Sequence, residues 1–211
     1  MPKVVIADSS CLIILSKIGE LELLHLLYSR IYITSEIEIE FGESLPEWII
    51  VETVQNKQYQ KFLETKVDIG EASAMALAKE NTDSLLIVDD LKGRKIAQEL
   101  NLVFTGTLGI ISKAKEAGHC NRIKPIIEKI LQTNFRISQA VVNALLLRYG
   151  ENKGGPRDES KDISSIYPLA ERQRDRFDYT QWRQEGLPKS SLKELAKAAN
   201  TLTNYLGNPH V

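Results

Sequence analysis

Ser84-Leu-Leu-Ile-Val-Asp-Asp90 is the stretch that decides the fold. Its four consecutive apolar residues lack the alternation of a half-exposed strand, which is typical of a strand buried on both faces. Strands of this kind occur in parallel sheets that helices cover on both sides. Two aspartates follow at once, so the segment predicts both a central strand and an acidic group at its carboxyl end.

The same alternation of strand and helix extends in both directions from this segment. Val4–Ala7 predicts another strand, and Asp8 separates it from a helix with apolar residues from Leu12 onward. Ser35 is the expected N-cap of a helix that ends at Gly42. Further strands are expected at 31–34, 48–52 and 102–104, and helices at 21–27, 36–41, 56–66, from about 70, 91–100, 108–117, 123–132 and 138–149. The pattern predicts an α/β protein with a three-layer α/β/α fold around a central parallel sheet.

Composition indicates one main domain with an appendage. The chain has 211 residues, 43% of them hydrophobic and 26% charged, with a formal net charge of -1. We expect a domain over residues 1–150, followed by a Gly- and Pro-containing linker and a helical C-terminal extension over 151–211, whose role the sequence does not give. No apolar run approaches the ~20 residues of a membrane span. No export signal is recognisable either, so a cytoplasmic protein is expected.

The near-neutral total hides an uneven charge distribution. Residues 1–90 contain 7 basic and 16 acidic residues, whereas residues 91–136 contain 9 basic and 3 acidic ones. An acidic half can bind divalent cations, and the basic segment can approach a polyanion. For any single one of these charges, a solvated helix face is the better explanation, and only their clustering favours a nucleic-acid surface.

Four segments place carboxylates at one edge of the predicted sheet. Asp8 follows the first strand, and Asp89 and Asp90 follow the buried strand at 84–88. Glu40 lies on a helix that begins after another strand end, and Glu71 lies in the first turn of the helix near residue 70. Ligands of open parallel sheets bind outside the carboxyl ends of the strands. The topology therefore predicts that these acids meet.

Crowded carboxylates are suited to hard divalent cations. Mg²⁺ and Mn²⁺ prefer oxygen ligands, and a few carboxylates suffice where substrate phosphate supplies the rest. Such ions activate water and stabilise the transition state of phosphodiester hydrolysis. Each acid also has a structural interpretation: Glu71 complements a helix dipole, Asp68 acts as a cap, and one of the Asp89–Asp90 pair caps the next helix.

The order of these motifs resembles the PIN (PilT N-terminus) domain family, and within it a prokaryotic branch close to the VapC-like ribonuclease toxins. The resemblance covers about residues 3–150. It is carried by Val4-Val-Ile-Ala-Asp-Ser-Ser-Cys-Leu-Ile13, Ile33-Thr-Ser-Glu-Ile-Glu-Ile-Glu-Phe-Gly42 with Leu45-Pro-Glu-Trp-Ile49, Asp68-Ile-Gly-Glu-Ala-Ser-Ala-Met-Ala76, Leu85-Leu-Ile-Val-Asp-Asp-Leu-Lys-Gly-Arg94 and Thr105-Gly-Thr-Leu-Gly109.

The resemblance implies a metal-dependent nuclease that cuts RNA. The acids implied as catalytic and metal-binding are Asp8, Glu40, Glu71 and Asp90, with Asp89 as a further metal ligand. The resemblance implies that Ser10 and Thr107 contact the substrate or line its pocket. In the basic segment, Lys92 and Arg94 are expected to hold phosphates. The implied cofactor is Mg²⁺ or Mn²⁺. The implied partners are RNA, a cognate antitoxin protein that covers the acidic site, and a second copy of the chain in a homodimer.

Two functions from different classes follow. The first is a metal-dependent endoribonuclease, a hydrolase that acts as the toxin of a toxin–antitoxin pair. The second is a catalytically silent PIN-like module that binds RNA or serves in assembly. A phosphatase is disfavoured, because Asp8-Ser9-Ser10 lacks a second acid two residues after the first. A P-loop enzyme is excluded, because no Gly-x-x-x-x-Gly-Lys-Ser/Thr motif is present.

Overall fold

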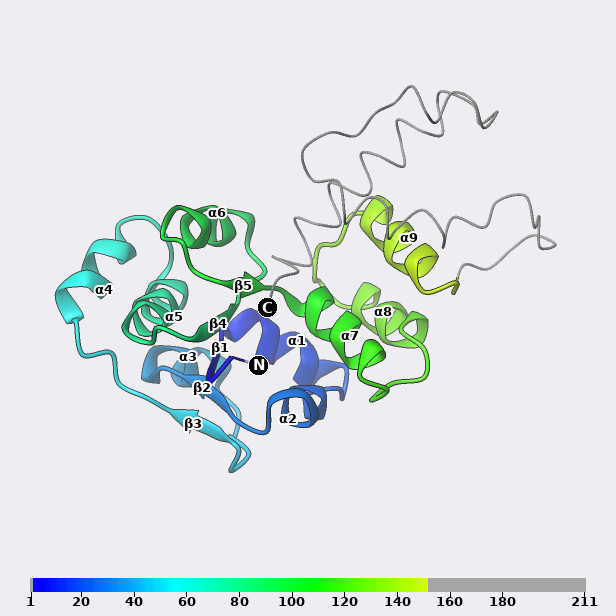
Figure 1. Cartoon of the computed structure of the whole chain (residues 1–211), viewed down its shortest axis with the longest axis horizontal. Coiled ribbons are helices and arrows are strands. Elements are labelled where there is room, and N and C mark those ends of the chain that lie inside the picture. The colour runs from blue at the N-terminus through cyan, green and yellow to red at the C-terminus, as the bar shows by residue number, and fades with distance from the viewer. Residues whose placement is uncertain (1, 152–211) are drawn as a thin grey trace, which may run out of the picture. The chain divides into compact units, whose positions relative to one another are not determined.

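A computed structural model describes residues 2–151, which form a five-stranded sheet and nine helices (Figure 1). All neighbouring strands are parallel, in the order β3-β2-β1-β4-β5. The strands are β1 (Val4–Ala7), β2 (Ile31–Ile33), β3 (Ile49–Val51), β4 (Ser84–Ile87) and β5 (Phe104–Thr105). The helices are α1 (Ser9–Lys17), α2 (Glu22–Tyr28), α3 (Ser35–Phe41), α4 (Lys57–Glu64), α5 (Ile69–Glu80), α6 (Leu91–Glu99), α7 (Thr107–Glu116), α8 (Lys124–Leu131) and α9 (Gln139–Arg148).

Helices cover both faces of the sheet. Figure 1 shows α5 and α4 on one side, and α1, α2 and α7 on the other. α5 packs against β1 and β4, and α4 packs on α5. The core between these layers holds fully buried side chains such as Ile6, Leu12, Met75 and Leu86. The predicted α/β/α arrangement with a central parallel sheet is confirmed.

The strand order reverses next to β1, and this reversal positions the acids. From β1 the chain proceeds through β2 and β3 on one side, and it returns with β4 and β5 on the other. Ala7 pairs with Ile87 at the ends of β1 and β4, and the amide of Asp8 donates to the Ile87 carbonyl at 3.0 Å. A reversal of this kind opens a crevice at the carboxyl ends of the two strands.

Two details of the predicted elements are wrong. The N-cap of α3 is Thr34, not Ser35: Thr34 is extended and its Oγ1 accepts from the Ile37 amide at 3.4 Å. The last strand begins at Phe104 rather than at residue 102, because the amide of Leu102 still donates to the Ala97 carbonyl of α6. Asn101 adopts a left-handed φ of 54° at that point, so residues 101 and 102 end the helix.

The described residues divide into two compact units. The first contains the sheet and the helices up to α8, ending at Phe135, and the second begins at Arg136 and contains α9. Ser138 caps α9 as expected. The linker and helical extension predicted after residue 151 lie outside the described residues, and the boundary near residue 151 stays a prediction. Within residues 2–151, no helix combines the length and the apolar character that a bilayer span requires.

Candidate active site

Asp8 lies buried where β1 passes into α1. Its side chain does not cap the helix; it accepts hydrogen bonds from Ser10 Oγ at 2.5 Å and from Ser9 Oγ at 3.5 Å. Burial raises the pKa of this carboxyl to about 6, and the charges of Asp68 and Glu40 add to the rise while the Ser10 hydroxyl opposes it. Ser10, predicted to contact substrate, holds the orientation of Asp8 in this structure.

Three carboxylates converge over Gly70, in the first turn of α5. A Cβ atom at Gly70 would lie 2.7 Å from Glu40 Oε2, 3.7 Å from Asp8 Oδ1 and 3.8 Å from Asp68 Oδ1. These acids come from α3, from the end of β1 and from the cap of α5. Glycine is needed here because the carboxylates occupy the space that a side chain would fill.

Glu71 lies next to this group and extends it toward β4. It is buried in the first turn of α5, and its amide donates to Asp68 Oδ1 at 2.9 Å. Burial raises the pKa of Glu71 to about 8, with further increases from the charges of Asp68, Asp8 and Asp90, while Lys92 lowers it. Its Oε1 lies 2.7 Å from the position of a Cβ atom at Gly93 in α6. Glu71 therefore joins the acids of β1 and α5 to the end of β4.

Asp90 and Asp89 have different surroundings although they are adjacent. Asp90 is exposed and caps α6, because its Oδ2 accepts from the amides of Lys92 and Gly93 at 2.7 and 2.9 Å. Its charge acts on Glu71. The expectation that one of the pair caps this helix is met by Asp90, whose charge is also close enough to Glu71 to raise the pKa of Glu71.

Asp89 belongs to a separate buried cluster. Its Oδ2 accepts from Thr107 Oγ1 at 2.5 Å, and its Oδ1 accepts from the Thr107 amide at 3.0 Å and lies 3.4 Å from Arg94 Nη2. Burial raises the pKa of Asp89, and the Arg94 guanidinium and the Thr107 donors oppose the rise. Both oxygens of Asp89 are engaged by Thr107 and Arg94 in this structure, and the assignment of Asp89 as a metal ligand stays a prediction.

The predicted substrate-contacting residues fall into two groups. Lys92 is exposed and close enough to Glu71 to lower its pKa, which suits a phosphate contact beside the acids. Arg94 and Thr107 are buried; Arg94 Nε donates to the Val88 carbonyl at 2.9 Å and both residues contact Asp89. In this conformation Arg94 and Thr107 support the turn after β4 and present no exposed group to a substrate.

Asp68 is the site residue that sequence reasoning assigned only to capping. It does cap α5, yet its charge also raises the pKa of both Asp8 and Glu71. The same atom, Asp68 Oδ1, accepts the capping hydrogen bond and lies over Gly70, because a carboxylate oxygen can accept more than one interaction. The available signal was the spacing Asp68-x-x-Glu71, which places two acids in one helical turn.

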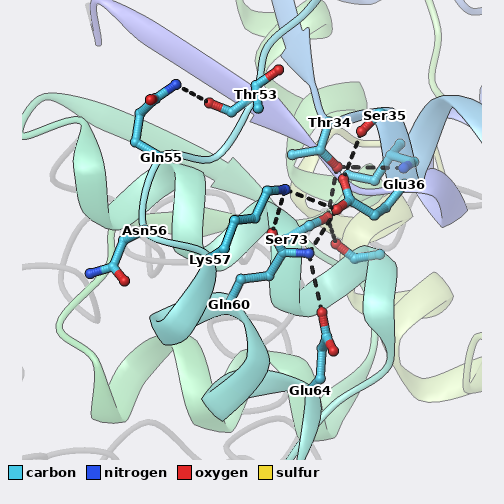
Figure 2. A network of polar contacts seen from close by, with 12 residues as sticks. Thr34, Ser35, Glu36, Thr53, Gln55, Asn56, Lys57, Gln60, Glu64 and Ser73 are labelled. Atoms are coloured by element: carbon cyan, nitrogen blue, oxygen red, sulfur yellow. Dashed lines mark hydrogen bonds and ion pairs between the residues drawn. The ribbon is translucent and has the colours of Figure 1, made fainter.

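A network of side chains connects α3, the helix that contains Glu40, to α4 and α5 (Figure 2). Thr34 Oγ1 and Ser73 Oγ lie 2.6 Å apart, and Ser73 donates its proton to the Gly70 carbonyl, so Thr34 is the donor to Ser73. Glu36 Oε1 accepts from Gln60 Nε2 at 2.7 Å and lies 3.3 Å from Lys57 Nζ. Partial burial opposes the ionisation of Glu36, but these donors lower its pKa to about 2.

The donor set suits a hard divalent cation. All the side-chain ligands on offer are oxygen atoms. Burial and mutual repulsion raise the pKa values of Asp8 and Glu71, and a bound cation would offset that repulsion. In the part of the chain that the structure describes, no three His, Cys, Asp or Glu side chains are arranged as a complete metal-binding group. Mg²⁺ commonly binds one or two carboxylates and retains several waters. The residues therefore fit an ion whose coordination shell is completed by water and substrate.

Comparison with known proteins gives one match. A family model described as a PIN domain matches residues 4–151, a span that includes every acid discussed above. No curated protein matches the chain, and no solved structure does. Because the match extends over well more than half of the sequence, the chain belongs to the PIN domain family and carries the nuclease-type fold of that family.

Proposed function

We propose that the protein is a metal-dependent endoribonuclease that hydrolyses phosphodiester bonds of RNA. The observation that carries the proposal is the convergence of Asp8, Glu40 and Asp68 over Gly70, with Glu71 and Asp90 adjoining. Two acids of the group, Asp8 and Glu71, are buried and have raised pKa values. Perturbed carboxylates of this kind are a feature of functional sites, because their repulsion lowers stability unless a ligand relieves it. The PIN domain match over residues 4–151 supports a nuclease.

The roles follow from the placement of each group. Asp8, Glu40, Glu71 and Asp90 would hold Mg²⁺ or Mn²⁺, and Asp68 adds its charge beside them. When bound, such an ion lowers the pKa of water and neutralises developing charge on the phosphoryl oxygens. Ser10 orients the Asp8 carboxylate, and Lys92 offers an ammonium group to a phosphate next to the scissile bond. In the reaction a water oxygen bonds to phosphorus, the bond to the leaving nucleoside oxygen breaks, and that oxygen takes up a proton.

The biological role that we propose is that of a toxin in a toxin–antitoxin pair. It rests on the resemblance of the five motifs to the VapC-like branch. A small antitoxin that covers the acidic site, a homodimer and a cytoplasmic location belong to the same proposal. Expression of the parent chain should arrest growth of a bacterial host, whereas expression of Asp8→Asn should not.

One observation favours the second candidate, a catalytically silent RNA-binding or assembly module. No complete three-ligand metal group exists among residues 2–151. The rival predicts RNA binding without cleavage.

The test is cleavage of a mixed RNA pool by the purified chain, with the ends of the fragments mapped. Mn²⁺ should support cutting, and EDTA should abolish it. Asp8→Asn should lower the cleavage rate about 100-fold or more. Loss of a residue that only supports a metal ligand already lowers activity or metal affinity about 10- to 100-fold. Glu38→Gln is the matched control, because Glu38 is an exposed acid of α3. Equal cleavage by Asp8→Asn and the parent would disprove this mechanism, and no cleavage by folded parent protein would favour the rival.

A further inference from the structure

The outward face of α4 combines aromatic and basic side chains. Phe62 is 55% exposed, and its ring stacks against that of Tyr59 with centroids 6.5 Å apart and an interplanar angle of 25°. Lys66 Nζ lies 5.5 Å from the centroid of the Phe62 ring, and Lys61 is exposed beside it. We call these four residues, Tyr59, Lys61, Phe62 and Lys66, the α4 platform.

Phe62 is not needed to attach α4 to the protein. Gln60 and Leu63 are buried and supply the inward face of the helix, which packs on α5. Asn56 caps the helix by accepting from the Tyr59 amide at 3.0 Å. A phenyl ring left largely in water retains apolar area that could be buried by a ligand.

The basic character of the platform stands out against its surroundings. It lies within residues 1–90, which carry 7 basic and 16 acidic residues. Lys57, the other lysine of α4, is engaged by Glu36 and Gln60. The positive charge of the platform therefore comes from Lys61, which is exposed on α4, and from Lys66, which is half-buried in the turn after α4.

The platform adjoins the acidic site through a short ordered connection. The amides of Thr65, Lys66 and Val67 donate to carbonyls at the end of α4, at 3.3, 2.8 and 3.1 Å. Asp68 then caps α5. The Cα atoms of Lys66 and Asp68 are at most about 7.6 Å apart, because consecutive Cα atoms lie 3.8 Å apart. The end of the platform that carries Lys66 is therefore adjacent along the chain to one of the site carboxylates.

We propose that the α4 platform binds single-stranded RNA and leads it to the acidic site. A base stacks on Phe62 in place of the Lys66 ammonium, which moves to a phosphate, and Lys61 holds a second phosphate. This inference rests on the proposed nuclease function and assigns it a substrate-binding surface. Exposed aromatic rings stack on unpaired bases, and neighbouring lysines contact phosphates without reading sequence. Bases in a duplex are stacked on one another, so the platform selects single strands.

The experiment is fluorescence anisotropy of the full-length chain with an unstructured, mixed-sequence oligoribonucleotide, in EDTA so that no cleavage occurs. Phe62→Ala should weaken binding about 5-fold or more, the effect of losing one base–aromatic stack, and Phe62→Trp should restore it. Lys61→Ala and Lys66→Ala should each lower the slope of log K against log salt by about 0.7. Controls are Leu26→Ala, a 48% exposed apolar residue of α2, and Lys17→Ala, an exposed lysine of α1; both helices lie on the other side of the sheet from α4 in Figure 1.

A parallel measurement of cleavage by the parent chain in Mn²⁺ separates the two proposals. If the parent cuts RNA but Phe62→Ala binds it as tightly as Leu26→Ala does, the platform is refuted and the nuclease stands. If binding depends on Phe62 but no cleavage occurs, the nuclease is refuted and the platform stands. The platform would be overturned if the parent chain bound no RNA, or if it bound a hairpin duplex as tightly as the single strand. It would also be overturned if Phe62→Ala changed the oligomeric state without changing the affinity for RNA.

Discussion

Gly70 shows how a single residue shapes the acidic site. Its missing side chain leaves the space in which the carboxylates of Glu40, Asp8 and Asp68 approach one another. The first atom that a methyl group would meet is Glu40 Oε2, at the end of a flexible side chain. A methyl group at this position would therefore displace the Glu40 carboxylate and spare the backbone.

Gly70→Ala should separate activity from stability. Because only the end of the Glu40 side chain must move, the free energy of unfolding should change by less than about 1 kcal/mol. RNA cleavage in Mn²⁺ should fall about 10-fold or more, since a misplaced ligand weakens the metal site. Thermal unfolding and cleavage are measured on the same preparation. A variant that cuts RNA at the parental rate would show that the position of Glu40 does not matter.

Asp89 and Asp90 should respond in opposite ways to substitution. Asp90→Asn keeps a side-chain acceptor for the amides of α6, so stability should change by less than about 0.5 kcal/mol while cleavage falls strongly. Asp89→Ala leaves the buried Arg94 without its carboxylate, which should cost about 3 kcal/mol in stability. Urea denaturation and RNA cleavage distinguish the two effects. A stable, inactive Asp89→Ala variant would instead identify Asp89 as a metal ligand.

At the scale of elements, α3 is held in place by polar contacts from two neighbours. Thr34 connects its first turn to α5 through Ser73, and Glu36 connects it to α4 through Lys57 and Gln60 (Figure 2). Glu40 lies one helical turn beyond Glu36, on the same side of α3. The network therefore couples the packing of α4 to the position of a site carboxylate.

Glu36→Ala should destabilise the protein because it leaves the buried Gln60 amide with fewer partners. The expected cost is about 1–3 kcal/mol in the free energy of unfolding, against about 0.5 kcal/mol or less for the exposed control Glu38→Ala. The folded-state pKa of Glu36, about 2, lies below its ordinary value of 4.5. Its contribution is thus fully present above pH 4.5 and is lost as pH falls toward 2. A difference between parent and variant that stays constant from pH 5 to pH 2 would contradict this assignment.

At the scale of the whole molecule, the acidic site opposes folding in the absence of a cation. The folded-state pKa values of Asp8 and Glu71, about 6 and about 8, exceed their ordinary values of 3.8 and 4.5. Between about pH 4 and pH 8 the folded chain holds more protons at these groups than the unfolded chain does. The free energy of unfolding contributed by these groups therefore falls as pH rises through this interval.

Addition of Mn²⁺ should reverse this trend. An ion that binds the folded state stabilises it, and its competition with protons weakens as pH rises. The increase in melting temperature on addition of Mn²⁺ should accordingly be larger at pH 8 than at pH 6. Glu71→Gln should make the metal-free protein less sensitive to pH and should reduce the gain from Mn²⁺. Scanning calorimetry at a series of pH values with EDTA or Mn²⁺ measures both effects, and a melting temperature that Mn²⁺ leaves unchanged at every pH would contradict them.

The sequence by itself determined the elements and the edge of the sheet at which the acids meet. Buried apolar runs such as that of β4 identify strands locally, and parallel topology brings the acids that follow them to one edge. Only the tertiary structure decided which oxygen atoms face the site. Asp89 and Asp90 are adjacent and chemically identical, but the backbone after β4 directs Asp89 to Thr107 and Arg94. It directs Asp90 to the first amides of α6, where its charge still acts on Glu71. Asp68 likewise joined the site only through packing of α5 against β1, because side-chain direction and burial depend on neighbours that are distant in sequence.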